Sequence, residues 1–128
     1  MEISQIMLVL CLIGGLQFKH FICDGPLQTK AMVVAKSNYG AWMGIAHSGL
    51  HAIGTALVIA ISGFPLILIF WLAVLDFALH YHIDYAKENL VKYSGWTVHN
   101  GQFWWALSAD QMLHQFSYLI FAFLVFRA

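Results

Sequence analysis

Histidine and aspartate residues recur at a spacing of four in otherwise apolar stretches of this sequence. The clearest pair is His47 and His51, which are separated only by Ser-Gly-Leu. A spacing of four places two side chains one turn apart on the same face of an α-helix. The other sets follow the same rule: His20 and Asp24; Asp76, His80 and Asp84; Asp110 and His114. Neutral imidazoles and ionised carboxylates are ordinary ligands of divalent metal ions, so the spacing predicts metal-binding helices.

The residue types suggest a division of roles. The predicted metal ligands are His20, Asp24, His47, His51, His80, Asp84 and His114. Zinc is the expected ion, with iron or manganese as alternatives. Asp110 and Asp76 are the candidate catalytic residues, because a carboxylate that does not bind the metal can act as a general base. Zinc proteases use the same histidine spacing, but the glutamate that serves them as a base is missing between His47 and His51.

The composition indicates where such helices would reside. Of the 128 residues, 61% are hydrophobic and only 9% are charged. A soluble domain carries roughly a quarter charged residues, so this chain lacks the polar surface needed to face water on all sides. We therefore predict an integral membrane protein whose first partner is the lipid bilayer. The formal net charge is zero, which gives no reason to expect nucleic acid as a partner.

Four stretches are apolar and long enough to cross a bilayer, which takes about 20 residues. They cover residues 3–24, 41–62, 65–86 and 103–126. The amino-terminal stretch has no Lys/Arg-rich start and no small-residue cleavage site, so we interpret it as a retained span. Gly63 and Pro65 form a short turn between the second and third spans, which must be antiparallel neighbours. The predicted fold is all-α: one domain, residues 1–128, that forms a bundle of four transmembrane helices.

The topology places the polar pairs at a common depth. Four spans put both polar connections on one side, with the short turn and both termini on the other. The connections carry four lysines, which makes them cytoplasmic and the termini external by the positive-inside rule: Lys30, Lys36, Lys87 and Lys92. The polar pairs come late in the first and third spans and early in the second and fourth. All four pairs should therefore lie in one layer near the cytoplasmic boundary.

Ionisable groups in a membrane span are costly, and they usually face the bundle interior and pair with one another. An aspartate at a helix centre costs roughly 2.5–3.5 kcal/mol on insertion scales. A shared divalent cation would offset that cost, and the carboxylates would also orient the ligating histidines. The alternative is a polar network that only fixes helix packing through hydrogen bonds.

Taken in order, the motifs resemble a family of small, histidine-rich bacterial and phage inner-membrane proteins. The family is known only as a domain of unknown function, family thirty-three-oh-seven. The similar segments are His20-x-x-x-Asp24-x-x-x-Gln28, His47-x-x-x-His51, His80-x-x-x-Asp84-x-x-Lys87 and Asp110-Gln111-x-x-His114. The resemblance covers nearly the whole chain and implies a multi-pass helical protein of the bacterial inner membrane with a polar site inside the membrane. It implies no activity.

Four functions are compatible with these residues. The first is a metal-dependent hydrolase that acts on a lipid-linked or amphipathic substrate. The second is a proton or divalent-cation carrier or channel, although the layer lies on one side only; a homo-oligomer could supply the rest of a path between subunits. The third is a haem-binding bundle, which the acidic groups disfavour because such pockets are mainly apolar. The fourth is a structural or regulatory phage membrane protein whose polar layer serves packing.

Overall fold

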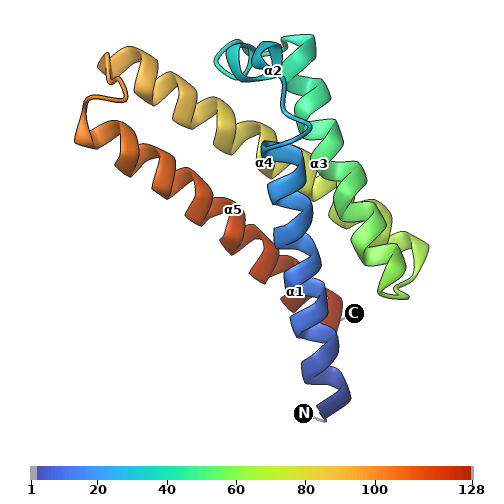
Figure 1. Ribbon diagram of the computed structural model, residues 1–128. Helices are drawn as coiled ribbons and strands as arrows, with labels where there is room; N and C mark the ends of the chain where they lie inside the picture. Colours follow the sequence, from blue (N-terminus) through green and yellow to red (C-terminus); the bar gives the residue numbers. More distant parts are fainter. Residues whose placement is uncertain (1–2, 128) are drawn as a thin grey trace.

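The computed structural model describes residues 3–127, so residues 1, 2 and 128 of the predicted domain lie outside it. This part of the chain forms five α-helices and no β-strand (Figure 1). The helices are α1 (Ile3–Asp24), α2 (Lys30–Ala35), α3 (Trp42–Ile61), α4 (Leu66–Ser94) and α5 (Gly101–Arg127). The prediction of an all-α fold is confirmed.

The two polar connections lie at one end of the molecule, as the sequence predicts. Helix α2 and the α4–α5 connection occupy this end, whereas the α3–α4 turn and both chain ends lie toward the other (Figure 1). Gly63 takes a left-handed conformation in the turn (φ +82°), and Pro65 caps the start of α4. Helix α4 packs against both α3 and α5, and α1 packs against α3 and α5.

Two features of the polar end differ from the prediction. The first connection contains the short helix α2, whose start is capped by the Thr29 hydroxyl accepting from the Met32 N–H. Helix α2 packs on α3 and is followed directly by Lys36. Helix α4 ends at Ser94 rather than near residue 86, because no helix-breaking residue precedes Gly95, which adopts φ +68°. The extra turns of α4 form one wall beside the polar residues.

Three helices of the described chain, not four, are long and apolar enough to cross a membrane: α1, α3 and α4. Helix α5 has sufficient length but contains Asp110, Gln111, His114 and Gln115 in its middle, which lower its hydropathy. Its second half nevertheless packs in the apolar core, beside helices that are apolar enough. The predicted fourth span is therefore not supported by hydropathy alone.

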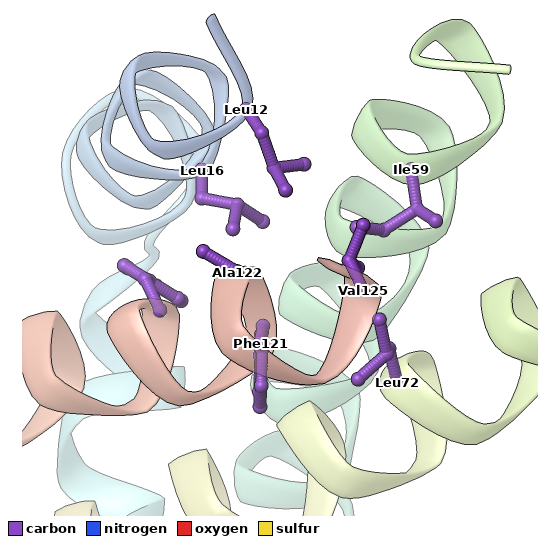
Figure 2. Close-up of a cluster of buried hydrophobic side chains, with 8 residues drawn as sticks. Leu12, Leu16, Ile59, Leu72, Phe121, Ala122 and Val125 are labelled. Carbon is purple, nitrogen blue, oxygen red and sulfur yellow. The ribbon is translucent and has the colours of Figure 1, made fainter. Parts of the chain in front are cut away.

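The apolar core lies between α1, α3, α4 and α5, on the side of the molecule that holds the chain ends. Figure 2 shows Leu12 and Leu16 of α1, Ile59 of α3, Leu72 of α4 and Phe121 and Val125 of α5 gathered there. The exterior is also apolar: Ile61, Leu66 and Trp71 are 86%, 79% and 58% exposed. The burial pattern is thus inverted with respect to a water-soluble protein, which normally exposes its charged groups.

Two glycines allow α1 and α3 to approach closely. A Cβ atom at Gly15 would lie 3.0 Å from Val58 Cγ1, and one at Gly54 would lie 3.1 Å from Lys19 Cδ. The Lys19 side chain therefore runs along the surface of α3 where Gly54 leaves room. This contact fixes the position of a buried ammonium group.

Candidate metal centre

Four helices deliver the histidine and aspartate pairs to one place, and the spacing of four within each helix explains why. His47, His51, His80, Asp84, Asp110 and His114 are buried, and the Asp24 side chain is 19% exposed. The ring centroids of His47 and His114 lie 5.2 and 4.1 Å from that of His80. The predicted convergence of these side chains is thus present in the structure.

The first group of potential ligands joins α1, α3 and α4. It consists of Asp24, His47, His51 and His80, which each offer one atom within 4.8 Å of the others. Asp24 Oδ1 lies 3.1 Å from Nε2 of His47, 3.1 Å from Nε2 of His51 and 3.8 Å from Nε2 of His80. Three imidazoles and one carboxylate are a ligand set that suits a tetrahedral zinc ion.

The second group extends the first toward α5 and consists of His80, Asp84 and His114. Asp84 Oδ2 lies 3.3 Å from His80 Nε2 and 3.4 Å from His47 Nε2, and its other oxygen lies 3.6 Å from His114 Nε2. Asp110 Oδ1 approaches His114 Nε2 to 3.5 Å. Because His80 belongs to both groups and Asp84 touches histidines of both, the two groups form one continuous centre.

His20 is placed beside the centre rather than within either group. Its Nε2 lies 3.0 Å from Asp24 Oδ2 and 3.0 Å from Gln111 Oε1, and its Nδ1 lies 2.8 Å from the Tyr118 hydroxyl. These contacts orient the Asp24 carboxylate, whose other oxygen faces His47 and His51. His20 is thus placed to orient Asp24 and is not itself a member of either ligand group.

Asp76 lies one turn deeper than His80 on the same face of α4 and belongs to neither ligand group. Lys19 Nζ donates to Asp76 Oδ2 at 2.6 Å, and the Thr55 hydroxyl donates to the same oxygen at 2.8 Å. Lys19 and Asp76 are 6% and 2% exposed, so this is a buried ion pair. With its carboxylate held by two donors, Asp76 is less suited than Asp110 to act as a base at the centre.

Lys19 also contacts His51 and influences the position of its proton. Its ammonium donates to the His51 backbone carbonyl at 3.2 Å and lies 3.3 Å from His51 Nδ1. An ammonium can only donate, so Nδ1 of a neutral His51 accepts and the ring proton lies on Nε2, facing Asp24. A cation that binds His51 Nε2 must displace this proton, whereas His47 and His80 have no hydrogen-bond partner at Nδ1 within residues 3–127.

Sequence reasoning missed several residues that contact the centre. Thr55 and Tyr118 lie four residues after His51 and His114, so extending the spacing rule by one turn would have found both. Lys36 Nζ lies 2.9 Å from Asp84 Oδ2, although its sequence position in the first connection gave no such signal. Gln28 was not missed, since the family motif includes it: although Gly25 and Pro26 separate it from the first helix, it lies beside the centre and donates its amide to the Asp24 carbonyl.

The chemistry of the centre fits a bound divalent cation. Asp84 Oδ1, Asp110 Oδ1 and His114 Nε2 are buried and accept or donate no hydrogen bond within the described chain. His114 Nε2 lies 3.6 Å from Asp84 Oδ1 and 3.5 Å from Asp110 Oδ1, farther than a hydrogen bond requires. Buried polar atoms normally find partners, and a cation held by Asp84 and His114 would supply one where the described chain does not.

The fold and the site together define a class: an all-helical chain with an apolar exterior and a buried centre of histidines and aspartates. A family model matches residues 7–128, and the chain belongs to that family, which is described as Protein of unknown function (DUF3307). The resemblance to this family of unknown function is thus confirmed. Comparison with curated proteins and with solved structures gave no match.

Proposed function

We propose that this chain is a membrane-embedded, metal-dependent hydrolase acting on a lipid-linked or amphipathic substrate. The membrane location is supported by three sufficiently apolar helices and by the inverted burial pattern. Helix α5 is proposed as the fourth span, because Phe121 and Val125 pack at the same level as Leu12 and Leu72. We place the protein in the bacterial inner membrane, with both polar connections in the cytoplasm.

The observation that carries the metal proposal is the convergence of ligand atoms from different helices. Asp24 of α1, His47 and His51 of α3 and His80 of α4 point ligand atoms at one volume. A network built only for packing would direct each imidazole N–H to an acceptor, and several buried atoms of the centre lack such a partner within residues 3–127. Zinc is the ion that this set of nitrogen and oxygen ligands suits best.

In the proposed hydrolysis, different residues bind the metal ion, accept a proton and orient a metal ligand. His47, His80 and Asp24 would hold the ion, and a zinc ion bound there would supply a nucleophile from water at neutral pH and polarise the scissile group. Asp110 accepts a proton from the attacking water, since its carboxylate borders the centre without being enclosed by the first group. His20, Tyr118 and Gln111 keep the Asp24 carboxylate oriented.

Metal analysis and turnover test the proposal in sequence. Protein purified in detergent without chelator should contain at least one zinc equivalent, and His47→Ala/His80→Ala should remove it. The matched control, His82→Ala/His99→Ala, changes two exposed histidines and should retain the metal. Less than about a tenth of an ion per chain in the unchanged protein would overturn the proposal, because ligand-rich buried sites retain zinc tightly.

Turnover is then sought by incubating the zinc-loaded protein with bacterial lipid extract in mixed micelles and analysing products by mass spectrometry. Chelation should stop product formation and zinc should restore it. Asp110→Asn should keep the metal of the first group while slowing turnover by about 100-fold or more. A variant that loses neither metal nor rate would exclude Asp110 as the base.

A divalent-cation or proton carrier remains the second candidate, and one observation favours it. The polar contacts continue deeper than the centre, from His51 through Lys19 to Asp76 and Thr55. However, these contacts end at the apolar core formed by Leu12, Leu16, Ile59 and Leu72. These four side chains offer no polar group for an ion to follow, which counts against a complete path. Zinc flux into liposomes without turnover of any lipid would favour the carrier over the hydrolase.

A further inference from the structure

The boundary between α1 and α5, called the seam below, contains two cavities that follow one another along the helices. The one toward the chain ends has a volume of about 560 Å³ and is lined mainly by apolar residues, among them Val9, Ile13, Leu119 and Phe123. The other has a volume of about 370 Å³ and is lined by polar groups that include Gln17, Asp24, Gln111 and Gln115. The seam therefore changes from apolar to polar as it approaches the metal centre.

The sequence explains why both cavities follow one line. Along α1 the lining residues Gln5, Val9, Ile13 and Gln17 recur every four positions. Along α5 the lining residues Gln111, Gln115, Leu119 and Phe123 recur at the same spacing. Each series occupies one helix face. From Gln5 to Gln17 the helix rises about 18 Å, slightly more than half the roughly 30 Å apolar thickness of a bilayer.

A third cavity, of about 320 Å³, lies on the other side of the centre, between the polar connections and helices α4 and α5. It shares Asp24 and Gln111 with the polar cavity of the seam. Lys36 and Lys87 line it. Both ammonium groups are therefore close to the proposed metal and to the point where the seam ends.

The charges of this third cavity favour an anion once a metal is present. Lys36 pairs with Asp84 and Lys87 pairs with Glu88, while Asp24 and Asp110 have no lysine or arginine partner among the described residues. A divalent cation would compensate these two carboxylates. Because the Glu88 side chain is 23% exposed, it can turn to water and leave the Lys87 ammonium to an incoming anionic group.

From this arrangement we infer that the chain binds an amphiphile with a phosphate headgroup. The headgroup contacts Lys87 and Lys36 beside the metal centre, and one acyl chain runs along the apolar seam between α1 and α5. The seam offers the acyl chain about 18 Å between Gln17 and Gln5, and the amphiphile enters laterally from the cytoplasmic leaflet. The inference deepens the proposed function, on which it rests, by naming a phosphorylated lipid as the substrate class.

The test uses the full-length protein in phosphatidylcholine nanodiscs, both zinc-loaded and chelator-treated. The probe is a lysophosphatidic acid that carries a photoreactive diazirine in its acyl chain. The comparison compounds are the matching monoacylglycerol, which lacks phosphate, and glycerol 3-phosphate, which lacks the chain. Mass spectrometry should locate the crosslinks on residues 9–17 of α1 and 111–123 of α5. Both comparison compounds should compete at least about tenfold more weakly.

Two pairs of variants separate the chain site from the headgroup site. Leu119→Trp fills the seam, whereas Ile120→Trp changes a neighbour that is equally exposed (50%) but lies outside it. Lys87→Met removes the ammonium from the cavity, whereas Lys92→Met removes an exposed lysine of the same helix. Leu119→Trp and Lys87→Met should each weaken lysophosphatidate binding roughly tenfold, whereas Ile120→Trp and Lys92→Met should not. For Lys87, this is the order of magnitude of a hydrogen bond to a charged group. Lys87→Arg should retain binding.

The outcomes separate the inference from the proposed function. Crosslinks spread evenly over the outer faces of α3 and α4, or equal affinity for the phosphate-free lipid, would overturn the inference even in a protein that holds zinc. Crosslinks between two copies of the chain along the seam, with lipid excluded, would also overturn it. Absence of zinc would overturn the proposed function alone if lysophosphatidate binding still depended on Lys87 and Leu119.

Discussion

The Nε2 atoms of His47 and His80, which belong to different helices, lie 3.3 Å apart in the interior of the molecule. A hydrogen bond between two neutral imidazoles requires a proton on one of these nitrogens, so that one ring donates and the other accepts. A cation placed between them would replace that proton and bind both rings. Several predictions of the metal-centre hypothesis depend on this pair and on the residues around it.

Loss of His80 should affect metal binding more than loss of any other histidine. His80 belongs to both ligand groups, whereas His114 belongs to only one. His51 must give up its Nε2 proton, which stays on that nitrogen because Lys19 donates to Nδ1. We expect His80→Gln to lower zinc affinity by at least about tenfold more than His51→Gln or His114→Gln, given that even outer-sphere changes cost 10- to 100-fold. Competition with a chromogenic chelator measures the affinities, and His99→Gln in the exposed loop is the control. Equal losses for all three variants would contradict the shared role of His80.

The Lys19–Asp76 ion pair should be strongly coupled. Each partner is almost fully buried, so Lys19→Met or Asp76→Leu alone leaves a buried charge without its partner and should destabilise the fold by about 3–5 kcal/mol. The double variant should be markedly more stable than the sum of the single effects predicts. Denaturant titration of all four proteins in one detergent gives the coupling. Additive effects would indicate that the pair is solvated and not an internal bridge.

The spacing pattern made most of the centre predictable, because helical periodicity alone places His47 beside His51 and His80 beside Asp84. The antiparallel arrangement of the helices then predicted a common depth. What the pattern could not supply was rotation about each helix axis. Asp76 shares the periodic face of His80, yet it binds the ammonium of Lys19, a residue that the spacing pattern did not single out. Lys36 reaches Asp84 only because α2 folds back on α3, and this contact depends on tertiary packing.

Gly54 should be less tolerant of a larger side chain than Gly49 on the same helix. A Cβ at residue 54 meets the stem of Lys19 at 3.1 Å, whereas one at residue 49 meets nothing within 4 Å. Gly54→Val should displace Lys19 from Asp76 and lower stability by about 1–3 kcal/mol relative to Gly49→Val, as overpacking generally does. Both substitutions introduce the same β-branched residue, so the difference isolates the contact. The free energies of unfolding come from the same denaturant titration, and comparable values would show that the Lys19 stem can move aside at little cost.

Metal should stabilise the folded chain through binding alone. At a free zinc concentration about a hundredfold above the dissociation constant, the expected gain is about 2.7 kcal/mol. The shift in thermal unfolding between zinc-loaded and chelator-treated protein measures it. The His47→Ala/His80→Ala protein should show no shift, since its first ligand group is lost. A shift that persists in this variant would mean that zinc stabilises the protein from a different site.

The closeness of α3 and α4 across the Ser62–Pro65 turn also bears on how the chain is made. A ribosome releases Lys19 and Asp24 first, then His47, His51 and Thr55, and only afterwards Asp76, His80 and Asp84. The carboxylate of Asp76 in α4 is thus synthesised after Lys19 and Thr55, the two residues that donate hydrogen bonds to it. In the proposed membrane insertion, Asp76 meets these two donors as soon as α4 packs on α1 and α3, and α5 arrives last to complete the metal centre. The order of residues along the gene is therefore also an order of synthesis in which the two donors that hold Asp76 are made before it.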